Sequence, residues 1–161
     1  MYNLYMEIPN SDIVLRRTTL EDVEALAPIF DQYRIFYGQV SDVDGAAAYL
    51  KNRTERDESV IFVAWEQKMS KVAGFTQLYP SFSSVSMKRS WILNDLFVTE
   101  PFRKCGIARQ LMEVAREFAV NTGAKELALS TAKDNFIAQR LYESLGYERD
   151  DVFYHYYYTI K

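Results

Sequence analysis

The sequence predicts an α/β fold in which helices cover a mixed sheet. Its first strands are antiparallel and later ones have parallel character. Short runs of β-branched and aromatic residues indicate consecutive strands at 59–65, 71–80 and 89–98. Apolar residues at helical spacing indicate helices at 18–38, 41–54, 106–123 and 134–146. The strand–helix–strand unit at 89–130 favours a parallel pair, because its connection must cross over the sheet.

A strand and a capped helix open the chain. The apolar run "DIVLRR", 12–17, is suited to a first strand. A capping box then marks the start of a helix, formed either by Thr18 with Glu21 or by Thr19 with Asp22. Apolar residues recur at helical spacing beyond this point, so we expect the first helix here.

The middle of the chain continues with a second helix and the meander. Gly38 is suited to end the first helix. Ser41 or Asp42 then caps a second helix that runs to about Thr54. The turn "EQKMS" joins the next two strands, and "SFSSVS", 81–86, is expected as a polar surface loop.

The C-terminal part alternates helices and strands. Gly106 opens a helix that Gly123 ends, and "KELALS" follows as a strand. Asp134 is the expected cap of the next helix, and Gly146 is its expected end. The tail "YERDDVFYHYYYTIK" is expected to supply one or two closing strands. The predicted order is β–α–α–β–β–β–α–β–α–β(–β), in a single domain over 1–161.

Composition excludes several classes of partner. The net charge of −3 argues against duplex nucleic acid, which requires a concentrated positive surface. No apolar stretch approaches the ~20 residues that cross a bilayer, so we expect no membrane partner. Cys105 is the only cysteine, which favours a reducing compartment, and a metal site is not expected. The start lacks a signal-peptide pattern, so we expect a cytoplasmic protein.

The stretch "FRKCGIARQLM", 102–112, has the features of an anion site. Arg103 and Lys104 stand just before Gly106, which opens a helix. The first amides of a helix have no internal acceptor and carry a partial positive charge. The alternative is a turn glycine with two solvated cations, and these features alone do not decide between the two. The two familiar glycine-rich phosphate motifs are absent.

Two motifs resemble the GNAT superfamily of N-acetyltransferases. The pattern Arg103-x-x-Gly106-x-Ala108 is similar to its acyl-CoA signature, Gln/Arg-x-x-Gly-x-Gly/Ala. The stretch "NFIAQRLYESLGY", 135–147, is similar to its later motif, N-x-x-A-x-x-x-Y-x-x-x-G-Y/F. The stretch "WILNDLFV" most resembles the diamine-acetyltransferase branch, in which glutamate is usual at the position of Asn94.

The resemblance implies transfer of an acetyl group from acetyl-CoA to a primary amine of a small molecule or peptide. The amine attacks directly in a ternary complex, without a covalent enzyme intermediate. The pantetheine arm would pair with Leu96, Phe97 and Val98 and would contact Asn135. Backbone amides would hold the pyrophosphate, and they belong to Arg103, Lys104, Cys105, Gly106, Ile107, Ala108 and Arg109.

The resemblance also implies catalytic residues. Tyr142 would be the general acid for the leaving thiolate, although its spacing alone would fit a core residue. Asp95 is one candidate for the base, and an ordered water is the other, because the amide of Asn94 cannot accept a proton. A backbone N–H near Phe97 or Val98 would stabilise the oxyanion.

Acidic and aromatic residues suggest where the acceptor amine binds. Asp31, Tyr33, Tyr37 and Asn94 are the predicted substrate residues. The aromatic tail suits burial in a homodimer. Two alternatives to the enzyme remain, namely a non-catalytic acyl-CoA-binding module or sensor on the same fold, and a domain whose basic loop binds another phosphate.

Overall fold

In the computed structural model of this chain, which describes residues 5–9 and 11–160, six strands form one sheet in sequence order. They are β1 (Tyr5–Glu7), β2 (Ile13–Arg17), β3 (Val60–Glu66), β4 (Lys71–Ser83), β5 (Lys88–Val98) and β6 (Leu127–Ala128). Neighbours from β1 to β5 are antiparallel, whereas β5 and β6 are parallel. This confirms the predicted mixed sheet, with its antiparallel meander and late parallel pair.

Four α-helices complete the described part of the chain. They are α1 (Val23–Phe36), α2 (Val43–Glu55), α3 (Ile107–Asn121) and α4 (Phe136–Ser144), with short 3-10 turns at Leu20–Asp22 and Glu100–Phe102. The chain divides into two compact units, the first ending at Ser130 and the second beginning at Thr131. The sheet, α1, α2 and α3 belong to the first unit, and α4 belongs to the second.

Local capping signals explain where the helices begin. The amide of Thr19 donates to Asp22 at 2.8 Å, as one of the two predicted capping boxes requires. Asp42 caps α2 by accepting from the Gly45 amide at 2.8 Å. The prediction for α4 was wrong by one residue, because Asn135 and not Asp134 is the N-cap.

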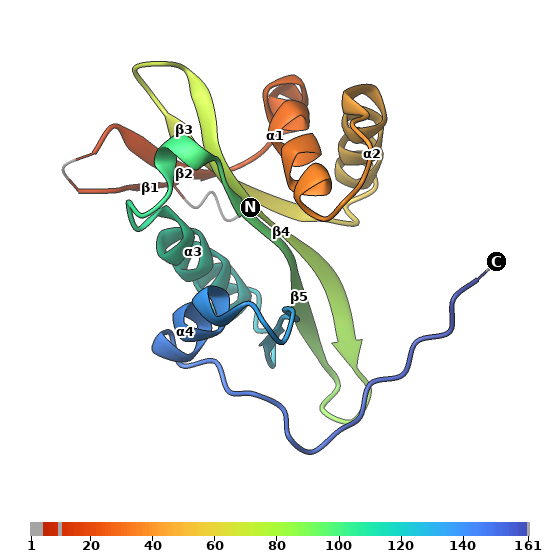
Figure 1. Ribbon diagram of the computed structural model, residues 1–161. Helices are drawn as coiled ribbons and strands as arrows, with labels where there is room; N and C mark the ends of the chain where they lie inside the picture. Colours follow the sequence, from red (N-terminus) through yellow and green to blue (C-terminus); the bar gives the residue numbers. More distant parts are fainter. Residues whose placement is uncertain (1–4, 10, 161) are drawn as a thin grey trace. The chain divides into compact units, whose positions relative to one another are not determined.

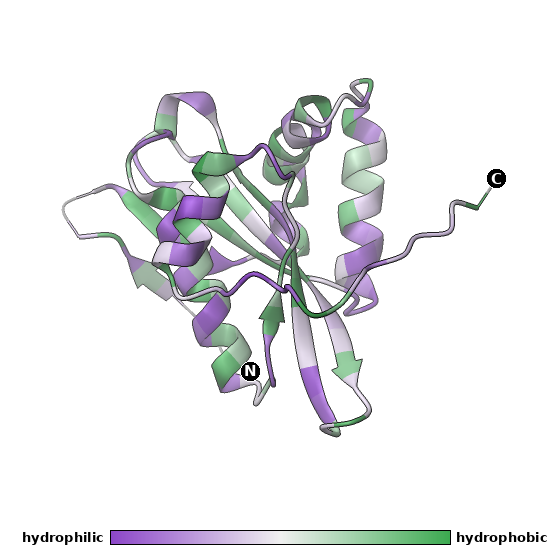
Figure 2. Cartoon of the chain, turned by 60° about the horizontal axis from the view of Figure 1, so that its bottom comes forward, coloured by the Kyte–Doolittle hydropathy of each residue, from purple (hydrophilic) through white to green (hydrophobic). Residues whose placement is uncertain are grey.

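Helices cover both faces of the sheet in the first unit. Figure 1 shows α1 and α2 on one side of the strands and α3 on the other. Hydrophobic and hydrophilic residues alternate around these helices, as amphipathic elements require (Figure 2). On the α3 side, Phe118 packs edge-on against Phe62, with ring centroids 5.5 Å apart.

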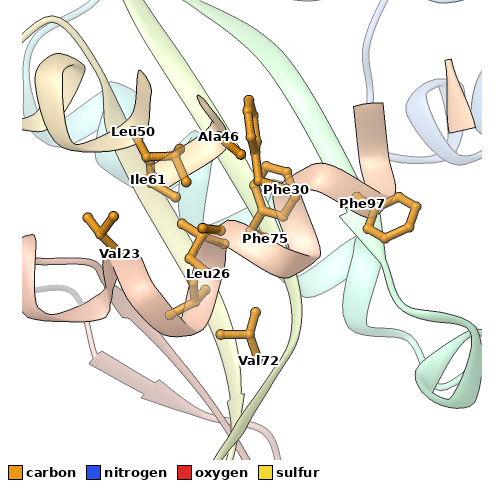
Figure 3. Packing of buried hydrophobic residues seen from close by; sticks show 11 residues of the cluster. Val23, Leu26, Phe30, Ala46, Leu50, Ile61, Val72, Phe75 and Phe97 are labelled. Carbon is orange, nitrogen blue, oxygen red and sulfur yellow. The ribbon is translucent and has the colours of Figure 1, made fainter. Parts of the chain in front are cut away.

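The main hydrophobic cluster lies between the helices α1 and α2 and the sheet. Figure 3 shows side chains from both helices and three strands converging there. Phe30 of α1 stacks on Tyr49 of α2 and contacts Phe75 of β4, at centroid distances of 5.9 and 5.8 Å. Burial of such side chains contributes roughly 1.5–3 kcal/mol each. This cluster therefore fixes α1 and α2 against β4.

The strands of the structure differ from the predicted ones in three places. The strand β1 was not predicted, because its three residues are too few to show a strand pattern. The strand β4 continues through 81–83, which was expected as loop, because these residues pair with β5 from Ser90 back to Lys88. The closing strands predicted in the tail are absent from 147–160. Aromatic residues favour a strand only where a neighbouring strand accepts the backbone hydrogen bonds.

No helix in the described residues is long and apolar enough to span a lipid bilayer. Within 5–9 and 11–160, no three His, Cys, Asp or Glu side chains are arranged to share a metal ion.

Candidate active site

A β-bulge in β5 determines which side chains face the helices α1 and α2. Gln77 of β4 pairs with Asp95, but the next residue of β4 pairs with Leu93, so Asn94 is an extra residue in the ladder. Such a bulge reverses the alternation of side chains along its strand. Before the bulge, Trp91 contacts Phe118 of α3, with ring centroids 5.1 Å apart.

Beyond the bulge, β5 presents its side chains to α1. The ring of Phe97 lies 6.1 Å from that of Tyr33, and the hydroxyl of Tyr33 is close enough to the carboxylate of Asp95 to lower the pKa of that group. With regular alternation through Asn94, Asp95 would share a face with Trp91 and would point toward α3. The bulge thus brings an acidic group to the face that carries α1 and α2.

Asp95 is a buried carboxylate surrounded by neutral donors. Only 4% of its surface is exposed. Gln77 Nε2 donates to Oδ2 at 2.6 Å, and Asn94 Nδ2 donates to Oδ1 at 3.0 Å. Burial raises the pKa of Asp95, while the hydrogen bonds from Gln77, Tyr33 and Asn94 oppose that rise. No Lys, Arg or His side chain of the described residues forms an ion pair with it.

Tyrosines surround this carboxylate on the helix side. Burial raises the pKa of Tyr33, and the nearby charge of Asp95 raises it further. Tyr37 lies edge-on to Tyr33, with centroids 5.0 Å apart, and 59% of Tyr37 is exposed. The structure therefore brings together Tyr33, Asn94 and Asp95 from the predicted residues, with Tyr37 next to them.

Asp31 has a different environment from the other predicted substrate residues. Its buried carboxylate accepts hydrogen bonds from Ser41 Oγ at 2.6 Å, Arg34 Nη1 at 2.7 Å and the Asp42 amide at 2.9 Å. The bond from Ser41, then that from Asp42, lowers the pKa of Asp31. These bonds connect α1 to the start of α2, so the geometry assigns Asp31 a role in holding the loop between the helices.

The turn before α3 has an unusual backbone. Lys104 and Gly106 both have positive φ angles, of 62° and 80°. The amides from Lys104 to Ala108 have no hydrogen-bond acceptor among the described residues. A Cβ added at Gly106 would meet no atom within 4 Å, so the backbone there is open. Consecutive amides in such a turn form a concave anion site.

Arg103 acts differently from its neighbours in the turn. Its own amide donates to the Glu100 carbonyl at 3.2 Å, so this one of the predicted phosphate donors is already bonded. Its side-chain Nε donates to the Val98 carbonyl at 3.0 Å, and its guanidinium lies 5.6 Å from the centre of the Phe97 ring. Arg103 therefore fixes the turn to the end of β5.

The end of β5 is an unpaired sheet edge. The strand β6 pairs only with Trp91 and Ile92, so among the described strands none pairs with the outer edge of Leu96–Val98. An extended ligand can add to such an edge through backbone hydrogen bonds. The unpaired edge leads directly, through Thr99 and the 3-10 turn, into the open amides before α3.

The remaining two predicted residues lie in the second unit. Asn135 Oδ1 accepts from the Ala138 amide at 3.3 Å and so caps α4. Tyr142 lies on α4, with its ring 6.2 Å from that of Tyr147, whose amide donates to the Tyr142 carbonyl at 3.1 Å. These contacts set the local geometry of the motif 135–147.

Residues 26–147 match the Acetyltransferase (GNAT) family. The chain belongs to this family. The uncharacterised N-acetyltransferase YhfO of Bacillus subtilis (strain 168) is 51% identical over 142 residues, which cover 88% of this chain and 94% of YhfO. A probable acetyltransferase of Haemophilus influenzae is 32% identical over 79% of this chain and 84% of its own. The crystal structure of a probable acetyltransferase superposes with a TM-score of 0.87 at 42% identity, covering 91% of this chain and 97% of the other.

Three residues near Asp95 in this GNAT protein were missed by the sequence analysis. They are Gln77 and Tyr79 of β4 and Tyr49 of α2. Gln77 Nε2 donates to Tyr79 Oη at 3.0 Å, and the Tyr79 and Tyr49 hydroxyls are 2.7 Å apart. A glutamine inside the apolar strand "GFTQLY" was a usable signal, because buried polar side chains are kept only with partners.

Proposed function

We propose that this GNAT protein transfers the acetyl group of acetyl-CoA to a primary amine of a small molecule. The observation that carries the proposal is the row of open amides from Lys104 to Ala108 at the end of an unpaired strand edge. A diphosphate at these amides gains several N–H donors and the favourable end of the α3 dipole. Lys104 and Arg109 add positive charge.

The thioester arm would then follow β5. A pantetheine chain bound at the amides would extend along Leu96–Val98 as an added strand. A backbone N–H near Phe97 or Val98 would stabilise the developing oxyanion. The acetyl carbon would come to lie near the bulge, and so near Asp95.

The buried carboxylate supports an amine as the acceptor. A carboxylate without a cationic partner is costly in the protein interior, and an incoming ammonium group would offset that cost. Over parts of this chain, the protein is similar to an aminoglycoside N(6′)-acetyltransferase of Salmonella typhimurium, 34% identical over 64 residues, and to an L-ornithine N5-acetyltransferase of Arabidopsis thaliana, 29% identical over 75 residues. Both names refer to a small molecule acetylated on nitrogen, which is the class of acceptor that we propose here.

The proposed reaction is direct transfer. The acceptor ammonium loses a proton to Asp95, directly or through a water, since an alkylammonium is protonated near neutral pH. The free amine attacks the thioester carbonyl, so that a C–N bond forms and the C–S bond breaks. Tyr142 donates a proton to the departing thiolate, and the second proton of the attacking nitrogen leaves to solvent. Holding both substrates in line supplies much of the rate.

An amine panel tests the proposal. Free thiol release from acetyl-CoA is measured with polyamines, amino acids and aminoglycosides, and the product is identified by mass spectrometry. We expect release only with amines, and a large loss of kcat in Asp95→Asn. Binding of acetyl-CoA without transfer to any amine would favour the acyl-CoA-binding module instead. Failure to bind acetyl-CoA in calorimetry would overturn both functions.

A further inference from the structure

Gln77 is a buried side chain with an unused acceptor. It has no exposed surface, and it lies in the middle of β4 opposite Asp95. Its nitrogen donates twice, to Asp95 Oδ2 at 2.6 Å and to Tyr79 Oη at 3.0 Å. Its oxygen Oε1 is buried and has no hydrogen-bond partner among the described residues. An orphaned buried acceptor is destabilising, so packing alone does not explain a glutamine at this position.

Two hydroxyls connect Gln77 to the surface. Tyr79 Oη lies 2.7 Å from Tyr49 Oη on α2, and 43% of Tyr49 is exposed. Because Tyr79 accepts a hydrogen bond from Gln77, its own proton is available for Tyr49, which can then donate to solvent. The chain of hydrogen bonds therefore runs from the buried carboxylate to the outer surface of α2.

The two ends of a carboxamide suit the two forms of a carboxyl group. An ionised carboxylate only accepts, so it needs the amide nitrogen. A protonated carboxyl group donates, so it needs the amide oxygen. A half-turn of the Gln77 amide exchanges the two, and Tyr79 can reverse its hydroxyl to donate to the same oxygen. Oε1 thus gains partners when Asp95 carries a proton, while the amide nitrogen moves to the position that has no partner among the described residues.

We propose that Gln77 is a positioning residue for Asp95, and that its amide rotates to follow the protonation of that carboxylate, with the hydroxyls of Tyr79 and Tyr49 reversing in step. The role of this rotation in catalysis rests on the proposed function, in which Asp95 accepts the proton of the acceptor amine. The orphaned oxygen is then the acceptor that awaits this proton. The rotation lets the protonated form, which burial favours, donate to an acceptor instead of facing the N–H group.

Among the described residues, the groups that face Asp95 include no charged side chain in direct contact that could shift its titration. From α1, the Tyr33 hydroxyl faces the carboxylate and lowers its pKa, and from its own strand Asn94 donates to it. From β4, Tyr79 faces it beside Gln77, while Arg53 of α2 acts on Tyr79. All direct partners of Asp95 are therefore neutral. The amides of Gln77 and Asn94 can both present a donor or an acceptor after a rotation, but Asn94 is exposed to solvent, whereas Gln77 is fully buried and its oxygen has no partner among the described residues.

Carboxyl 13C NMR on the full chain without substrate tests the proposal, with Asp95→Asn used to assign the signal. In the wild type, we expect the side-chain amide signals of Gln77 to move with the same midpoint as the Asp95 carboxyl. In Gln77→Met, which keeps the volume but removes the donors to the carboxylate, we expect the Asp95 midpoint to rise by about one pH unit or more. The acidic limb of kcat/KM should shift in the same direction.

Leu78→Ala is the matched control. Leu78 is a fully buried neighbour on β4, so this variant loses stability while leaving the Asp95 midpoint in place. Gln77 amide signals that stay fixed while Asp95 titrates would overturn the proposal, and this wild-type measurement requires no variant to fold. An unshifted midpoint in Gln77→Met would also overturn it. Shifted midpoints in a protein that acetylates no amine would refute the proposed function alone.

Discussion

Replacing Gly106 by alanine tests the phosphate site, because the same change at Gly38 provides a matched control. Both glycines have φ near +80°, at 80° for Gly106 and 82° for Gly38, and at both an added Cβ meets nothing within 4 Å. Neither variant therefore creates a clash with protein atoms. They differ only in place, since Gly38 follows α1 and Gly106 opens α3 within the row of open amides.

The expected loss of stability is equal at the two sites. A left-handed conformation costs an L-residue roughly 1–2 kcal/mol. The alanine also restricts the unfolded chain, which returns about 0.4–1 kcal/mol. The net loss is about 1 kcal/mol, or roughly 2–4 °C in the melting temperature of a chain of this size. Thermal unfolding followed by circular dichroism measures it.

The expected loss of acetyl-CoA affinity occurs only at Gly106. There the new Cβ projects into the open space before the amides, and relaxation of φ rotates those amides away from a bound phosphate. Loss of one such charge-assisted bond is worth about 1.5–3 kcal/mol, or roughly 10–150-fold in Kd. Calorimetry compares the two variants with the wild type. Unchanged affinity for acetyl-CoA in Gly106→Ala, or equal losses of affinity in both variants, would refute phosphate binding at the open amides from Lys104 to Ala108.

Three further outcomes follow from the geometry. Gly74→Ala should unfold about 1–3 kcal/mol more easily in urea, because its Cβ would lie 2.7 Å from the Phe97 carbonyl of the paired strand; wild-type stability would contradict this close approach. Asp31→Asn should lower the melting temperature at pH 7 and flatten its fall in acid. The lowered pKa of Asp31 gives stability that is present above about pH 4 and is lost as pH falls through the folded-state pKa. If the melting temperatures of Asp31→Asn and the wild type fell equally in acid, this contribution of Asp31 would be excluded. Tyr142→Phe should lower kcat about 10²-fold or more while the Kd for acetyl-CoA stays constant, and an unchanged kcat would remove Tyr142 as the general acid.

Three helix starts that depend on residues a few positions apart were predicted correctly from the sequence. The capping box of Thr19 and Asp22, the Asp42 cap and the opening of α3 by Gly106 all appear in the structure at the predicted residues. Each depends on backbone groups that lie three or four residues apart, so tertiary contacts are not needed to define them. The missing tail strand shows the limit, because strand formation depends on a partner that composition does not specify.

The surroundings of Asp95 depend on the pairing register of β4 and β5, which the sequence did not predict. The pairing of Gln77 with Asp95 follows from the bulge at Asn94, and Tyr49 reaches Tyr79 only because α2 packs over β4. Asp31 illustrates a second limit. An acidic residue among tyrosines suggested an amine site, but nothing in the sequence indicated that Ser41 and the Asp42 amide of the following loop donate hydrogen bonds to it.

The bulge at Asn94 also connects the two halves of the proposed site. One extra residue turns Asp95 and Phe97 toward α1, while the strand beyond it continues to the turn fixed by Arg103. With regular alternation, the carboxylate would face Phe118 and the apolar surface of α3, where an ionised group is strongly disfavoured. The proton acceptor Asp95 and the edge for the thioester arm, Leu96–Val98, thus lie within four consecutive residues of one strand, and their separation is set by the backbone rather than by flexible side chains. That rigidity is the condition under which proximity can supply most of the catalysis.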